Sequence, residues 1–119
     1  MKIINQLVLV FIFAFSGNVL SAFTQPEIEQ LRKINESSAR QLEVSKENFN
    51  KAINEQVINT PERKEDILSL KKSWSETIYK KCKLTIFESL NTDAETAGMN
   101  KCLSTEYLLA SDYFKSLFP

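Results

Sequence analysis

Hydrophobic positions recur every three or four residues in the second half of the chain. Between Pro61 and Leu90 they step by 3, 4, 4, 4 and 4 positions, which keeps them on one stripe of an α-helix. The stripe consists of Ile67, Leu70, Trp74, Ile78, Cys82 and Ile86. The pattern predicts one amphipathic helix over about Pro61–Leu90.

Similar periodicity occurs on both sides of this segment. Upstream, a broad apolar face predicts a long helix over about Pro26–Ile58, with a bend or break expected at Ser37-Ser38; the face consists of Ile28, Leu31, Leu42, Phe49, Ala52, Ile53 and Val57. Downstream, we expect a helix from about Asp93 to Leu117, or from Ala97 if Gly98 delays its start. Its inner face would consist of Met99, Cys102, Leu103, Ala110, Tyr113, Phe114 and Leu117.

Helix-start signals precede each of these segments. Residues 24–27 and 92–95 both have the Thr-x-x-Glu spacing of a capping box, and Thr60-Pro61 places an N-cap residue before a proline. The chain has only 2 glycines and no strand-like alternation. We therefore predict an all-α fold, a small three-helix bundle in which the second and third helices form an antiparallel hairpin.

The first 22 residues have the organisation of a secretory signal peptide. Lys2 supplies a positive charge, Leu7–Phe15 is continuously apolar, and small residues follow at Ser21 and Ala22. The apolar run is shorter than the ~20 residues of a membrane span. We expect cleavage of residues 1–22, export of a single domain over residues 23–119 to the periplasm or the medium, and no membrane insertion of the mature form.

Charge and composition exclude several classes of function. Of 15 basic residues only Lys2 is lost with the signal peptide, which leaves 14 against 15 acidic residues, so no nucleic-acid partner is expected. Histidine, the commonest general base and zinc ligand, is absent. We expect no catalytic, cofactor-binding or metal site, and therefore no enzyme and no cofactor.

The two cysteines are expected to form a disulfide. On an antiparallel hairpin, Cys82 and Cys102 would lie at the same level and face inward. An exported chain with two cysteines most simply pairs them. We predict a Cys82–Cys102 bridge between the second and third helices.

Two residues on the apolar faces allow alternative interpretations. Trp74 is either a core anchor whose indole N–H is bonded near the rim or a residue that contacts a partner, and its place on the stripe favours the core. Glu106 lies within the apolar face of the third helix, where a carboxylate needs a partner. Lys81 is near its level, so Glu106 is either in a structural ion pair or a functional carboxylate in a cleft.

The connection between the second and third helices is rich in apolar and acidic residues. Leu84, Ile86, Phe87 and Leu90 surround the end of the second helix, and Leu108 points away from the core face of the third. Packing on the first helix is the favoured interpretation of these side chains, and an exposed patch is the alternative. The nearby acidic residues are either a solvated face or a surface for a basic protein. The candidate partner-binding residues are Phe87, Glu88, Leu90, Asp93 and Glu95.

The segment Ile67–Trp74, followed by Tyr79 and Cys82 and then by Cys102, resembles the LprI-like family of small exported helical domains. Residues 49–53, Phe-Asn-Lys-Ala-Ile, resemble that family's Leu-Asn-x-x-Tyr segment. The likeness covers roughly residues 46–118. Ile53 stands where the family has Tyr, Lys71 stands where it usually has Gln, and the family's additional upstream cysteine is missing.

The resemblance implies a protein-binding function, the inhibition of lysozyme-type cell-wall hydrolases. The alternative hypothesis is a periplasmic immunity or scaffold protein with an unrelated partner. Both hypotheses assign a protein as the partner and no reaction to the chain itself.

Overall fold

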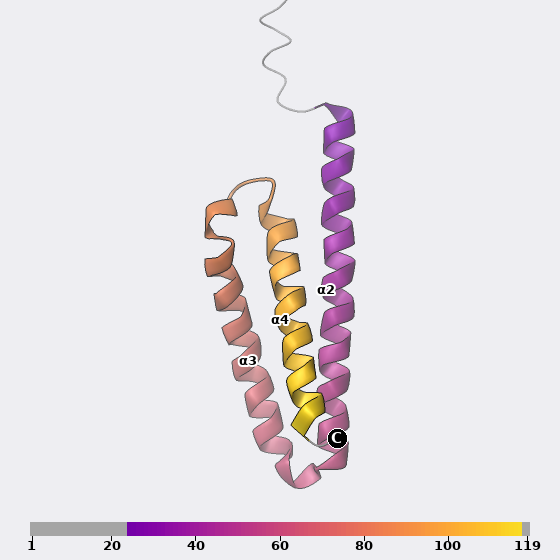
Figure 1. Cartoon of the computed structure of the whole chain (residues 1–119), viewed down its shortest axis with the longest axis vertical. Coiled ribbons are helices and arrows are strands. Elements are labelled where there is room, and N and C mark those ends of the chain that lie inside the picture. Colours follow the sequence, from indigo (N-terminus) through magenta and orange to yellow (C-terminus); the bar gives the residue numbers. More distant parts are fainter. Residues whose placement is uncertain (1–23, 118–119) are drawn as a thin grey trace, which may run out of the picture. The chain divides into compact units, whose positions relative to one another are not determined.

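The computed structural model describes residues 24–117, and this part of the chain is helical with no strand. Helix α2 covers Gln25–Asn59, α3 covers Lys64–Thr85 and α4 covers Glu95–Leu117. Two 3-10 turns, η1 (Pro61–Arg63) and η2 (Phe87–Ser89), lie before and after α3 (Figure 1). The predicted all-α fold is confirmed, whereas the predicted signal peptide lies outside the described residues.

The chain divides into two compact units after Arg32. In the first unit, Thr24 and Glu27 form the predicted capping box: the Thr24 backbone N–H donates to the Glu27 carboxylate, and the Glu27 N–H donates to the Thr24 hydroxyl. Glu29 forms an ion pair with Arg32 one turn later. The hydrogen bond from Arg32 lowers the pKa of the Glu29 carboxyl.

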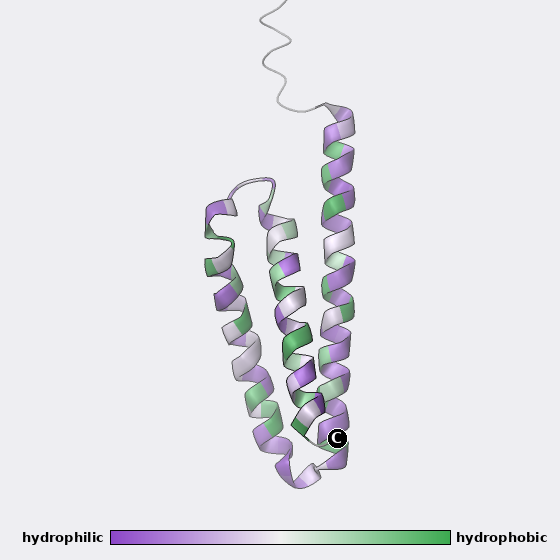
Figure 2. Ribbon diagram, viewed as in Figure 1, coloured by the Kyte–Doolittle hydropathy of each residue, from purple (hydrophilic) through white to green (hydrophobic). Residues whose placement is uncertain are grey.

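The second unit is a three-helix bundle built from the rest of α2, α3 and α4, with α3 antiparallel to α4 (Figure 1). Hydrophobic and hydrophilic positions are interleaved along each helix, as expected of helices that bury one face (Figure 2). The buried core takes residues from all three helices: Phe49, Ala52, Ile53, Ile67, Ile78, Cys82, Ala110 and Phe114. Phe49 contacts Tyr107 and Phe114, with ring centroids 5.1 and 5.9 Å apart, and so joins α2 to α4.

Small polar side chains align α2 with α4. The hydroxyls of Ser45 and Ser104 are buried and 2.7 Å apart, and the Asn100 amide donates to the Ser38 hydroxyl at 3.2 Å. A break at Ser37-Ser38, one of the two expected alternatives, is not found, because α2 continues through both residues. The Ser38 hydroxyl instead donates to the Asn35 carbonyl within α2, so it is satisfied without interrupting the helix.

The structure corrects the predicted end of the second helix and the predicted capping at its start. The second helix was expected to reach Leu90, but α3 ends at Thr85 because the backbone at Ile86 leaves helical geometry and continues as η2. Thr60 occupies the predicted N-cap position before Pro61, but its side chain does not cap the turn: its hydroxyl donates back to the Gln56 carbonyl at the end of α2. Pro61 does open the following turn, as its fixed φ and missing N–H allow.

Candidate functional site

The tip of the α3–α4 hairpin is held by the Cys82–Cys102 disulfide. The two Cα atoms are 5.6 Å apart, Cys82 is fully buried, and Cys102 is partly exposed. Cys82 lies in the last turn of α3 and Cys102 in the second turn of α4, so the bridge closes the loop that contains the turn between them. The predicted disulfide is confirmed.

The α3–α4 turn, residues 86–94, has its own hydrogen bonds. Asn91 has φ 61°, a left-handed conformation that Asn tolerates better than most residues. The Asn91 N–H donates to the Glu95 carboxylate at 3.1 Å, and the Ala94 N–H donates to the Thr92 hydroxyl at 3.2 Å. The predicted capping box is therefore present in altered form, because Glu95 reaches back to Asn91 rather than to Thr92.

The five predicted partner-binding residues divide between two surfaces. Phe87 is 66% exposed, and Glu88 and Asp93 are exposed on the same turn with no ion pair among residues 24–117. Leu90 and Glu95 are partly buried and line a groove beside the turn. The favoured interpretation, packing on the first helix, is wrong for Phe87, as it is for Leu84 and Leu108, which are 76% and 46% exposed. Ile86, by contrast, is buried.

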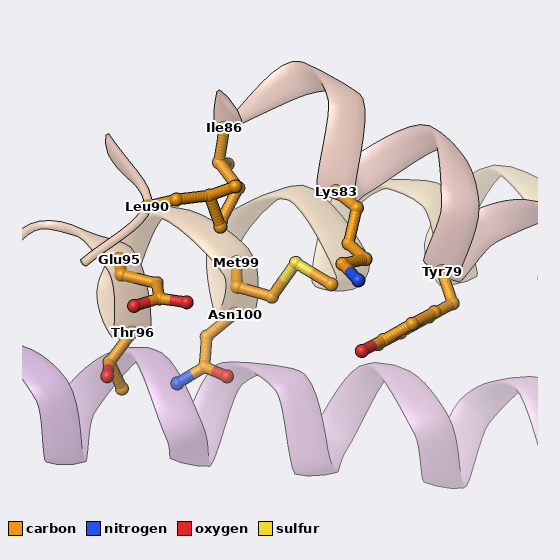
Figure 3. A pocket seen from close by; sticks show the side chains of 8 residues that line it. All are labelled: Tyr79, Lys83, Ile86, Leu90, Glu95, Thr96, Met99 and Asn100. Atoms are coloured by element: carbon orange, nitrogen blue, oxygen red, sulfur yellow. The ribbon is translucent and has the colours of Figure 1, made fainter. Parts of the chain in front are cut away.

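The groove has a volume of about 280 Å³ and takes residues from α3, the turn and α4. Its lining consists of Tyr79, Lys83, Ile86, Leu90, Glu95, Thr96, Met99 and Asn100 (Figure 3). Of these residues, only Leu90 and Glu95 were predicted as site residues. The spacing of Tyr79, Lys83, Ile86 and Leu90, 4, 3 and 4 positions, was the available signal, since residues at this spacing share one side of a helical segment.

Trp74 packs at the edge of the core rather than in its centre. Its ring centroid is 5.0 Å from that of Tyr113 and 5.7 Å from that of Phe114. Trp74 is partly buried, and among the described residues its indole N–H has no hydrogen-bond acceptor. The core interpretation holds for its packing, but the expected N–H bond near the rim is not found.

Glu106 is paired with Lys81 across the hairpin. The Lys81 Nζ lies 2.9 and 3.1 Å from the two Glu106 carboxylate oxygens. The structural ion pair that the sequence allowed is therefore present. Glu106 holds α3 and α4 together and is not among the residues that line the groove.

Two further properties of the described residues bear on the chemistry of the chain. Within residues 24–117, no cluster of three or more cysteine and carboxylate side chains is placed to hold a metal ion. In the same range, no helix has both the length and the apolar character needed to cross a membrane.

In comparisons with known proteins, no family model, no curated protein and no solved structure matches this chain. The resemblance to the LprI-like family therefore depends on the sequence likeness alone, that is, on residues 49–53 and the residues around Trp74, Cys82 and Cys102.

Proposed function

We propose that this chain is an exported protein-binding domain that presents the α3–α4 turn to a protein partner. The observation that carries the proposal is the occurrence on one turn of an exposed aromatic ring, Phe87, and two exposed carboxylates, Glu88 and Asp93, that form no ion pair with any described residue. Large exposed aromatic side chains are over-represented at the centres of protein interfaces. Exposed carboxylates on the same turn as such an anchor favour a partner with a basic surface.

The disulfide supports this proposal in two ways. Because Cys82 and Cys102 close the loop that carries the turn, less conformational entropy is lost when a partner orders it. Disulfides are also typical of oxidising compartments, in agreement with the export signal expected in residues 1–22.

A lysozyme-type cell-wall hydrolase is the partner class that we propose. Two arguments support it: the resemblance to the LprI-like family, and the suitability of a carboxylate-bearing turn for a basic enzyme cleft. The chain would act by occupying the cleft, with the Phe87 ring buried against the enzyme and Glu88 and Asp93 facing its basic side chains.

The test is inhibition of lysozymes of several classes by the oxidised protein in its exported form. We expect inhibition at micromolar protein, and an increase of about tenfold or more in the inhibition constant for a Phe87→Ala/Glu88→Gln/Asp93→Asn variant. A Leu108→Ala/Glu47→Gln/Glu55→Gln variant is the matched control, because it removes one exposed apolar side chain and two exposed carboxylates away from the turn.

Each negative result has a separate meaning. If no lysozyme class is inhibited at micromolar protein, a lysozyme-type hydrolase is rejected as the partner, and an immunity or scaffold role is favoured. If the turn variant and the wild-type protein inhibit equally well, the inhibitory function stands, but the α3–α4 turn is rejected as the binding surface.

A further inference from the structure

The groove beside the α3–α4 turn has opposite chemistry at its two ends. At one end, the Lys83 ammonium lies 5.9 Å from the Tyr79 ring centroid, and it forms no ion pair with any residue from 24 to 117. The Tyr79 hydroxyl and the Lys83 ammonium both point into the groove (Figure 3). This end therefore presents hydrogen-bond donors and an ammonium group that forms no ion pair with a carboxylate of the described residues.

The other end presents acceptors. One oxygen of the Glu95 carboxylate accepts the Asn91 N–H, which leaves the second oxygen available. The hydrogen bonds of Ser38 fix the orientation of the Asn100 amide. The single hydroxyl proton of Ser38 is donated to the Asn35 carbonyl, so the Ser38 oxygen can only accept a hydrogen bond from Asn100. Asn100 must therefore direct its NH₂ group toward Ser38. The amide oxygen of Asn100 is then free, and it lies on the Lys83 and Tyr79 side of the residue (Figure 3).

The surface between the two ends is apolar and adaptable. Ile86 is buried, while Leu90 and Met99 are partly exposed in the groove. An unbranched thioether side chain such as Met99 adjusts to ligands of different shapes. The volume of about 280 Å³ is close to the lower end of the range for ligand pockets, roughly 300–1,000 Å³, and suits a single large residue rather than a long segment.

We propose that this groove binds the C-terminal residue of a peptide that ends in an apolar amino acid. The main-chain carboxylate would lie at the Tyr79–Lys83 end and the apolar side chain against Met99. The peptide N–H would donate to the Asn100 amide oxygen or to Glu95. A terminal residue carries all three groups within the length of one residue, and a carboxylate beside a lysine ammonium forms the stronger, charge-assisted class of hydrogen bond.

This inference goes beyond the proposed function, because it needs no hydrolase and uses residues other than Phe87, Glu88 and Asp93. The probe is acetyl-Ala-Ala-Leu with a free carboxylate, added to the oxidised, isotope-labelled exported protein. NMR would follow the Met99 methyl group and the Asn100 side-chain amide. We expect both signals to shift at millimolar peptide.

Control peptides and lysine variants test the carboxylate and the apolar side chain of the ligand separately. The same peptide with a C-terminal amide, and acetyl-Ala-Ala-Gly with a free carboxylate, should each bind about tenfold more weakly or worse. Lys83→Met should weaken the binding of acetyl-Ala-Ala-Leu by a similar factor. Lys80→Met removes an exposed lysine outside the groove lining and should leave the binding of this peptide unchanged.

Three results would overturn the inference: no shift at Met99 or Asn100 with the acid peptide, equal binding of the acid and amide forms, or equal losses in the two lysine variants. A Phe87→Ala/Glu88→Gln/Asp93→Asn variant should bind the peptide as the wild-type protein does. Failure of hydrolase inhibition and failure of peptide binding are therefore separate outcomes.

Discussion

Lys81 and Glu106 join α3 to α4 through both oxygens of one carboxylate, beside the disulfide. Lys81 directly precedes Cys82, and Glu106 lies one helical turn after Cys102. The Glu106 side chain is 20% exposed and that of Lys81 is 57% exposed, so the carboxylate is the more buried partner. A covalent bridge and an ion pair thus fix the register of the hairpin within one turn of each other.

The first prediction is that this ion pair makes a small but measurable contribution to stability. Lys81→Met, Glu106→Gln and the double variant form a double-mutant cycle, and we expect a coupling free energy of about 0.5–1 kcal/mol because Lys81 remains largely hydrated. Urea unfolding of the four proteins gives the value. Zero coupling would mean that the pair does not fix the register in solution.

The second prediction concerns the disulfide. Replacement of both Cys82 and Cys102 by Ser should lower the free energy of unfolding by about 3 kcal/mol, since the bridge closes a loop of about twenty residues. The comparison is between oxidised wild-type protein and the double variant in urea. Wild-type protein measured with reductant should behave like the variant, because the reductant removes the same bridge. Alkylation of both thiols without reductant, in protein taken from its native compartment, would contradict the bridge.

Helical periodicity predicted the described fold well, because the core consists of residues that recur at helical spacing on the inner faces of the helices. Ile78, Cys82 and Phe114 were placed on inner faces from their spacing alone, and all three are buried. The Lys81–Glu106 pair followed from counting residues away from the disulfide in antiparallel directions. Such counting succeeds because α3 and α4 are regular on both sides of the bridge.

The sequence predicted the candidate site less well, because the site depends on where regular structure ends. Apolar positions continue with helical spacing to Leu90, yet the backbone turns at Ile86, and this change of direction brings Leu90 to the groove. Tyr113 was expected on the inner face but is 41% exposed, and its ring contacts Trp74 in a tilted arrangement at the edge of the core. The groove itself depends on the register between α3 and α4, which no single-helix pattern contains.

The third prediction is that Trp74 contributes to stability through ring packing. Trp74→Ala should destabilise the protein by about 3 kcal/mol, at the low end of the range for large aromatic truncations, because the side chain is only partly buried. Trp74→Phe should cost less, since a ring still meets Tyr113 and Phe114. Urea unfolding followed by circular dichroism checks both values. A Trp74→Ala protein of wild-type stability would instead favour the alternative in which Trp74 contacts a partner.

The last prediction concerns Gly98, the only glycine among the described residues, which lies in the first turns of α4. A Cβ added there would meet the Ile86 side chain at 3.5 Å, an ordinary van der Waals contact, and its backbone does not have positive φ. Gly98→Ala should therefore stabilise the protein by about 0.5–1 kcal/mol, because alanine restricts the unfolded chain and favours helix.

For a domain of this size, that gain corresponds to a rise in the melting temperature of roughly 2–8 °C. Gly98→Val is the informative comparison, because its branched side chain adds bulk beside Ile86 and has lower helix propensity. Its melting temperature should fall below that of Gly98→Ala. If Gly98→Ala lowers the melting temperature, then Ile86 packs more closely on α4 than the 3.5 Å contact indicates, and the start of α4 at Glu95 would need revision.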